Sequence, residues 1–140
     1  MNKMTNSLAL VLVLALAGMN AYAVSPVEVL KDYAAAARKE NPAFKEFSAR
    51  RGEALYHAER THSKGTKVSC SGCHTDNPKN PGQTRAHKQI EPMAPSANPQ
   101  RLTDPAKIEK WFSRNCPDVL ERACSAQEKG DFITYLLSIK

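Results

Sequence analysis

The sequence predicts an all-α domain of about four helices with a loop-rich middle. Helix-start signals precede stretches in which apolar residues recur at helical spacing. The segment from Thr61 to Arg101 holds most of the Pro and Gly that follow Ala23, and no run in it alternates long enough to make a strand. The 140 residues are 41% apolar and 24% charged, which is typical of a folded domain and not of a disordered chain.

The first two expected helices lie before this middle segment. Ser25 to Glu28 reads Ser-Pro-Val-Glu, a capping box with proline at the first helical position. Apolar residues then repeat until Asn41-Pro42, so we expect an additional N-terminal helix over about 26–40. A second helix is expected from about Ala43 to His57, with Phe44 and Phe47 on its apolar side.

The last two expected helices follow the middle segment. Thr103-Asp104-Pro105 opens a helix that we expect to stop near Asn115, because Pro117 disfavours helical backbone just before it. Ser125 to Glu128 reads Ser-Ala-Gln-Glu and is a capping box for the final helix. The sequence contains no internal repeat.

Residues 1–23 have the pattern of a cleaved secretory signal. Lys3 provides positive charge, Leu8 to Gly18 is apolar, and Ala21-Tyr22-Ala23 is a small-residue cleavage site. The apolar run is too short for a helix that crosses a bilayer, although an uncleaved anchor is the alternative. We therefore expect residues 24–140 to form one domain that is exported to the periplasm and has no membrane contact after cleavage.

The charge distribution excludes one large class of partner. The formal net charge is +6, from 20 Lys and Arg against 14 Asp and Glu. These basic residues are spread along the chain and form no single stripe, so we expect no nucleic-acid partner.

Cys70-Ser71-Gly72-Cys73-His74 is the attachment motif of c-type haem. Two thiols at this spacing can form thioethers with the two vinyl groups of one porphyrin, and the adjacent imidazole becomes the proximal iron ligand. A thioredoxin-like redox pair would need a preceding strand, and a zinc site would need two adjacent residues on one tetrahedral ion. We therefore expect one covalent haem c, held by Cys70, Cys73 and His74.

Cys116 and Cys124 are the other two cysteines. In an oxidising compartment they either form a disulfide or remain two free buried thiols, and export favours the disulfide. Its closed loop would stabilise the fold by about 2.5 kcal/mol in the chain-entropy description.

The sixth iron ligand is less well determined by the residues alone. Met93 is the single methionine after Ala23 and lies in a proline-rich loop, where an axial thioether is common. His57, His62 and His87 are weaker candidates, because a surface or packing role explains each of them.

From about Arg51 onward, the order of motifs resembles the SHP-type (sphaeroides haem protein) branch of class I monohaem cytochromes c. The matching pieces are Cys70-Ser71-Gly72-Cys73-His74, Gly82-Gln83-Thr84-Arg85, Ala94-Pro95-Ser96-Ala97 with Pro99, Glu109-Lys110-Trp111, and Arg114-Asn115-Cys116 with Cys124. Gly52 and Tyr56, facing Tyr135 and Leu136, are similar to the crossing of terminal helices in class I cytochromes.

The resemblance implies a class I cytochrome c fold wrapped around one haem, and it carries specific ligand roles. It implies that Asn115 is the second axial iron ligand, followed directly by the Cys116–Cys124 disulfide. It also implies that Asn115 leaves on reduction, that oxygen, nitric oxide or carbon monoxide then binds, and that a dihaem c-type cytochrome donates electrons. Met93 and Trp111 are then expected to pack against the haem, and the protein is expected to be monomeric.

Simple coordination chemistry agrees with this role for Asn115. An amide oxygen is a hard donor that suits ferric iron better than ferrous iron, whereas a thioether would hold ferrous iron and exclude gases. Two alternatives stay open, namely an electron carrier with His74 and Met93 as ligands, and an enzyme that converts oxygen or nitric oxide. No acid–base pair in the sequence argues for the enzyme, and a gas sensor would need an output partner.

Overall fold

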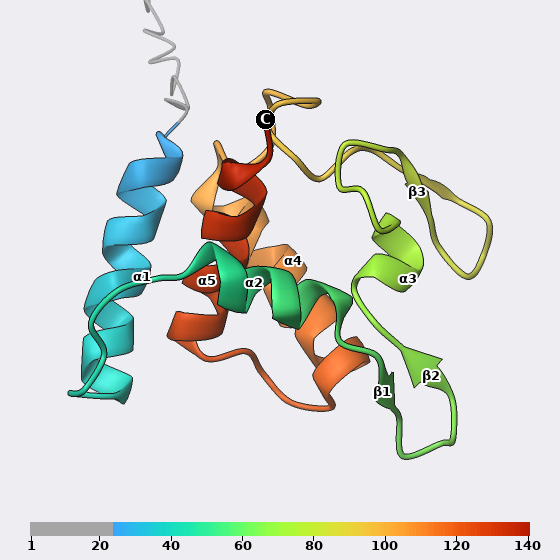
Figure 1. Cartoon of the computed structure of the whole chain (residues 1–140), viewed down its shortest axis with the longest axis horizontal. Coiled ribbons are helices and arrows are strands. Elements are labelled where there is room, and N and C mark those ends of the chain that lie inside the picture. Colours follow the sequence, from blue (N-terminus) through green and yellow to red (C-terminus); the bar gives the residue numbers. More distant parts are fainter. Residues whose placement is uncertain (1–23) are drawn as a thin grey trace, which may run out of the picture.

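The computed structural model describes residues 24–140, so the expected signal at 1–23 lies outside the described residues. The helices are α1 (Pro26–Glu40), α2 (Ala49–His57), α3 (Ser71–His74), α4 (Pro105–Leu120) and α5 (Ala126–Ser138). Helices α1, α2, α4 and α5 gather on one side, and α3 with strands β1, β2 and β3 lies on the other (Figure 1). None of these helices is long and apolar enough to span a bilayer.

Helices α1 and α5 begin at the two predicted capping boxes. The Ser25 hydroxyl accepts from the Glu28 amide at 3.3 Å, and the Glu28 carboxylate accepts from the Ser25 amide at 3.0 Å. Ser125 and Glu128 repeat the arrangement at 3.1 and 2.9 Å. Each box satisfies two backbone amides that a helix start leaves without partners, so both expected boundaries are confirmed.

The predicted start of the second helix at Ala43 is wrong, because α2 begins at Ala49. The Ser48 hydroxyl caps the helix by accepting from the Arg51 amide. The Ser48 amide in turn donates to the Asp131 carboxylate of α5 at 2.7 Å. This contact, 83 residues apart, fixes the chain in extended form before Ala49. Phe47 lies outside the helix, against Gly130 of α5.

The predicted end of the third helix near Asn115 is also wrong. Helix α4 runs through Pro117 to Leu120, and Glu121 closes it in the left-handed conformation with its amide on the Pro117 carbonyl. Pro117 lacks the amide hydrogen that would bond to the carbonyl four residues earlier, and α4 continues past this missing hydrogen bond. Asn115 and Cys116 therefore lie within α4 and not at its end.

Two very short antiparallel hairpins lie in the middle segment that was expected to be without strands. Strands β1 (Arg60–Thr61) and β2 (Lys67–Val68) form one, and β3 (Gly82–Gln83) and β4 (Gln89–Ile90) form the other. Each strand has two residues, too few for an alternating pattern to appear in the sequence. The fold is otherwise helical as predicted.

The core is built where α2 crosses α5, at the centre of Figure 1. Tyr56 and Leu136 are fully buried and cluster with Phe132 and Tyr135. The crossing requires a residue without a side chain, because a Cβ at Gly52 would lie 2.0 Å from the Asp131 carbonyl oxygen. The predicted contact of Gly52 and Tyr56 with α5 is therefore confirmed.

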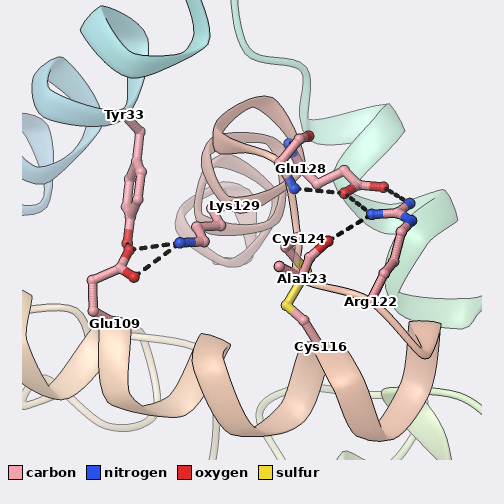
Figure 2. Close-up of a disulfide and its surroundings, with 9 residues drawn as sticks. Tyr33, Glu109, Cys116, Arg122, Ala123, Cys124, Glu128 and Lys129 are labelled. Carbon is pink, nitrogen blue, oxygen red and sulfur yellow. Dashed lines mark hydrogen bonds and ion pairs between the residues drawn. A yellow bond between two sulfur atoms is a disulfide. The ribbon is translucent and has the colours of Figure 1, made fainter. Parts of the chain in front are cut away.

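Helix α1, the additional helix expected over about 26–40, packs against α5 and α4. Its buried Val29 packs with Ile108 of α4 and Ile133 of α5. The Tyr33 hydroxyl donates to the Glu109 carboxylate, which the Lys129 ammonium also contacts, as Figure 2 shows. The helix is thus tied to both neighbours by apolar and polar contacts.

Candidate haem site

Helix α3 is a single turn that carries the Cys-x-x-Cys-His motif. The amides of Cys73 and His74 both donate to the Cys70 carbonyl, at 3.3 and 3.0 Å. Residues three apart in a helical turn lie on the same side, so the two thiols face one direction. Both thiols are free in the structure. The arrangement is suited to attaching one group at two points.

Two residues from other elements fix the backbone of this turn. The Tyr56 hydroxyl lies 3.0 Å from the His74 carbonyl oxygen and 2.7 Å from that of Thr75. Gly82 of β3 lies so close that a Cβ there would be 2.1 Å from the Cys73 carbonyl oxygen. The motif is therefore held between α2 and the β3–β4 hairpin.

His74 has the surroundings of a neutral, buried ligand. Its Nδ1 is buried and has no hydrogen-bond partner among residues 24–140. Burial lowers the pKa of His74, and the nearby positive charge of Arg101 lowers it further. A neutral imidazole is the form that coordinates iron, and a buried nitrogen without a partner is costly in a side chain of no other use.

The Cys70 thiol and Met93 pack against the same apolar cluster, made by Tyr56 and three residues of α5. Burial raises the pKa of the Cys70 thiol to about 11. The Met93 amide is fixed by donating to the Pro78 carbonyl at 2.8 Å. These residues provide an apolar surface next to the motif, as a porphyrin ring requires, so the residues present fit a covalent haem.

Arg101 is a half-buried cation beside this surface. Its guanidinium donates to the carbonyls of Pro92 and Glu91, at 2.8 and 2.7 Å. Burial lowers the pKa of Arg101, and none of the described ion pairs involves it. It thereby holds the loop that carries Met93 and places positive charge near His74.

Asn115 is half-buried on α4, directly before the disulfide. Among residues 24–140, no described hydrogen bond involves its side-chain amide. The expected Cys116–Cys124 disulfide is present, with the two Cα atoms 5.6 Å apart, and joins α4 to the start of α5 (Figure 2). The structure therefore anchors the helix one residue beyond Asn115.

Trp111 lies on the exposed side of α4. Its side chain is 44% exposed, and the Arg114 guanidinium lies 5.8 Å from its ring centroid. Packing of Trp111 against haem therefore stays a prediction. Phe112, its neighbour, packs edge-on against Phe132 in the core, with ring centroids 5.6 Å apart.

The three other histidines all have protein partners. His57 lies 3.3 Å from the Tyr135 hydroxyl and 3.6 Å from the Asp76 carboxylate. His62 lies 3.3 Å from the Glu121 carboxylate, and His87 contacts the Gln83 side chain at 3.4 Å. Each of these rings thus has a partner among the described residues.

Several residues of the site have no signal in the sequence. The bonds of Arg101 to the Met93 loop and the bond from Tyr56 to the motif correspond to no local sequence pattern. Gly82 belongs to a matching motif, but its close approach to Cys73 is visible only in the structure.

Comparison with known proteins finds one matching family and two cytochromes that are similar in sequence. Residues 42–136 match a family described as "Domain of unknown function (DUF1924)". The chain is 43% identical over 112 residues to cytochrome c-type protein SHP of Cereibacter sphaeroides, covering 80% of this chain and 82% of that protein. It is 36% identical over 107 residues to cytochrome c″ of Methylophilus methylotrophus, covering 76% and 74%.

Solved structures agree with the sequence relatives. Oxidised cytochrome c″ of Methylophilus methylotrophus superposes with a TM-score of 0.75 at 34% identity, covering 82% of this chain and 94% of that one. Oxidised SHP, described as an oxygen-binding cytochrome c, gives 0.72 at 39% identity and covers 81% and 96%.

Fold and site together define a c-type cytochrome, a helical electron-transfer protein that carries haem c. Its single Cys-x-x-Cys-His motif provides for one haem. The chain belongs to the family described as "Domain of unknown function (DUF1924)". SHP and cytochrome c″ are its relatives by sequence. The predicted all-α cytochrome fold and the haem c cofactor are confirmed.

Proposed function

We propose that the protein is an exported, periplasmic monohaem cytochrome whose distal ligand Asn115 leaves on reduction and makes room for a small diatomic gas. Cys70 and Cys73 hold the haem through thioethers, and His74 is the proximal ligand. When bound, the haem supplies an iron that accepts one electron and takes a sixth ligand.

One observation carries the role of Asn115. Asn115 is a half-buried residue of α4 that directly precedes a disulfide anchoring the helix, and no described hydrogen bond uses its side-chain amide. An amide that no described residue holds by a hydrogen bond is available to bind another group. The anchor limits how far Asn115 can move, so that release is a local movement and return is rapid.

The chemistry of the amide gives the direction of the change. A neutral amide oxygen is a hard, weak donor, so it binds ferric iron more favourably than ferrous iron. Asn115 would therefore hold the oxidised haem more strongly than the reduced haem. The relatives support this proposal. SHP is described as an oxygen-binding cytochrome c, and a solution structure of cytochrome c″ is described in terms of the structural basis of haem-ligand detachment.

The proposal also gives Arg101 a role toward the haem and names a redox partner. The Arg101 guanidinium, half-buried beside His74, is chemically suited to the carboxylate of a haem propionate. We further propose a dihaem c-type cytochrome as the electron donor and oxygen or nitric oxide as the physiological gas. The chain acts as a monomer.

A second function is favoured by the position of Met93. Its side chain packs on the apolar cluster that also contacts Cys70, so a thioether lies close to the candidate site. An electron carrier with His74 and Met93 as ligands would keep both ligands after reduction and bind no gas.

Carbon monoxide distinguishes the two functions. We expect the reduced wild-type holoprotein to bind carbon monoxide stoichiometrically with haem, seen as a shift of its absorption spectrum, and Met93→Leu to behave in the same way. A reduced wild type that binds none, together with a Met93→Leu variant that does, would establish the electron carrier instead.

A further inference from the structure

Glu121 occupies an unusual backbone position directly after α4. Its φ and ψ are 55° and 22°, the left-handed conformation that closes many helices. Glycine is the usual residue there, because a Cβ makes this conformation unfavourable. A glutamate in this position bears backbone strain, so an interaction of its side chain is expected to compensate for it.

The Glu121 carboxylate makes that interaction with the turn of the β1–β2 hairpin. It accepts from the Ser63 amide at 3.0 Å and from the Ser63 hydroxyl, and it lies 3.3 Å from the His62 ring. Hydrogen bonds from Ser63, together with the charges of His62 and Lys64, hold the pKa of the Glu121 carboxyl below its usual value. We call this contact the Glu121 clip.

The hairpin itself is a firm anchor. The His62 amide donates to the Thr66 carbonyl at 2.8 Å, and the Gly65 amide donates to the His62 carbonyl at 2.7 Å. Strand β2 ends at buried Val68, and the next hydroxyl, on Ser69, accepts from the Gly72 amide of the haem motif. The clip therefore connects the end of α4 to the segment that leads directly into Cys70.

We propose that Glu121 is a positioning residue that holds the C-terminal half of α4, in which Asn115 lies, at a fixed distance from the segment that leads into the haem motif. This inference rests on the proposed role of Asn115. The disulfide fixes α4 to α5 on one side, and the clip fixes it to the β1–β2 hairpin on the other. Without the clip the helix end can move away, and the ferric iron becomes more accessible to added ligands.

Glu121→Gly tests the clip without endangering the fold. Glycine is the preferred residue for this backbone conformation, so the variant relieves strain while it removes the carboxylate. We expect the Ser63 amide to lose its protection from hydrogen exchange. We also expect the affinity of the ferric holoprotein for azide to rise about fivefold. This is the change expected when Asn115 loses the positioning that one net hydrogen bond provides.

Two further variants make the test specific. Glu121→Gln keeps an oxygen that accepts from Ser63, so it should restore most of the wild-type behaviour. Arg122 lies in the loop that follows Glu121, and its guanidinium is 2.6 Å from the Glu128 carboxylate of α5. Arg122→Ala breaks this ion pair, drawn in Figure 2, and leaves the clip intact. We expect both the azide affinity and the Ser63 exchange rate of Arg122→Ala to match wild type.

The outcomes separate the clip from the ligand. If Asn115→Ala raises azide affinity while Glu121→Gly does not, the clip has no positioning role and the proposed function stands. If Arg122→Ala raises the azide affinity as much as Glu121→Gly does, the effect comes from general loosening of the loop and the clip inference is overturned. If Asn115→Ala leaves the azide affinity unchanged, both the proposed function and the clip inference are overturned.

Discussion

Replacing Asn115 with alanine should raise the affinity of the ferric holoprotein for azide by about tenfold to a hundredfold. An internal ligand that occupies the iron most of the time reduces the apparent affinity of an added ligand by the fraction of open sites. Removing the amide removes this competition and changes the ferric absorption spectrum. Spectroscopic titration with azide measures both effects in one experiment.

The matched control for this variant is Arg114→Ala on the same helix. Arg114 is exposed and contacts the ring of Trp111, so its loss should leave the ferric spectrum and the azide affinity unchanged. Carbon monoxide binding to the reduced protein should be nearly the same in wild type and Asn115→Ala, because the amide is already released. An unchanged ferric spectrum in Asn115→Ala would remove Asn115 from the iron.

Replacing Gly52 with alanine should destabilise the protein by about 3 kcal/mol, at the upper end of the range for overpacked sites. The new methyl group would lie 2.0 Å from the Asp131 carbonyl oxygen and 2.8 Å from the Tyr135 Cβ. Because these atoms belong to backbone or lie next to it, no rotamer change can relieve the clash and the two helices must separate. Chemical denaturation of the ferric protein measures the loss.

Two variants calibrate this result. Gly130→Ala should cost less, since the added methyl group meets the ring of Phe47, which lies in an irregular segment and can shift. Arg50→Ala, at an exposed position of the same helix, should lie within about 0.5 kcal/mol of wild type. Equal stability of Gly52→Ala and Arg50→Ala would show that the crossing is not the tight contact described.

The parts of the fold that were predictable depend on local signals. Both capping boxes, at Ser25 and Ser125, are complete within four residues, and both helices begin where predicted. The start of α2 was missed because its cap, Ser48, is held by Asp131 from the other end of the chain. The end of α4 was missed because a proline removes one hydrogen bond, which tertiary contacts beyond it can offset.

The site divides in the same way. Cys70, Cys73 and His74 lie within five consecutive residues, and this spacing is typical of haem attachment, so the haem was predictable from the residues alone. Asn115 was singled out by resemblance, since an asparagine in an amphipathic helix has no distinguishing local pattern. The Glu121 clip joins residues 58 positions apart, and the bonds of Arg101 follow from the shape of its loop, so neither has a recognisable sequence pattern.

The central claim is that an amide oxygen, and not a thioether, is the iron ligand that reduction releases. Crystal structures of the oxidised and reduced holoprotein in one crystal form test it most directly. We predict that the Asn115 side-chain oxygen is bonded to the iron in the oxidised crystal and withdrawn from it in the reduced crystal. Met93 sulfur bonded to the iron in both states would contradict the account.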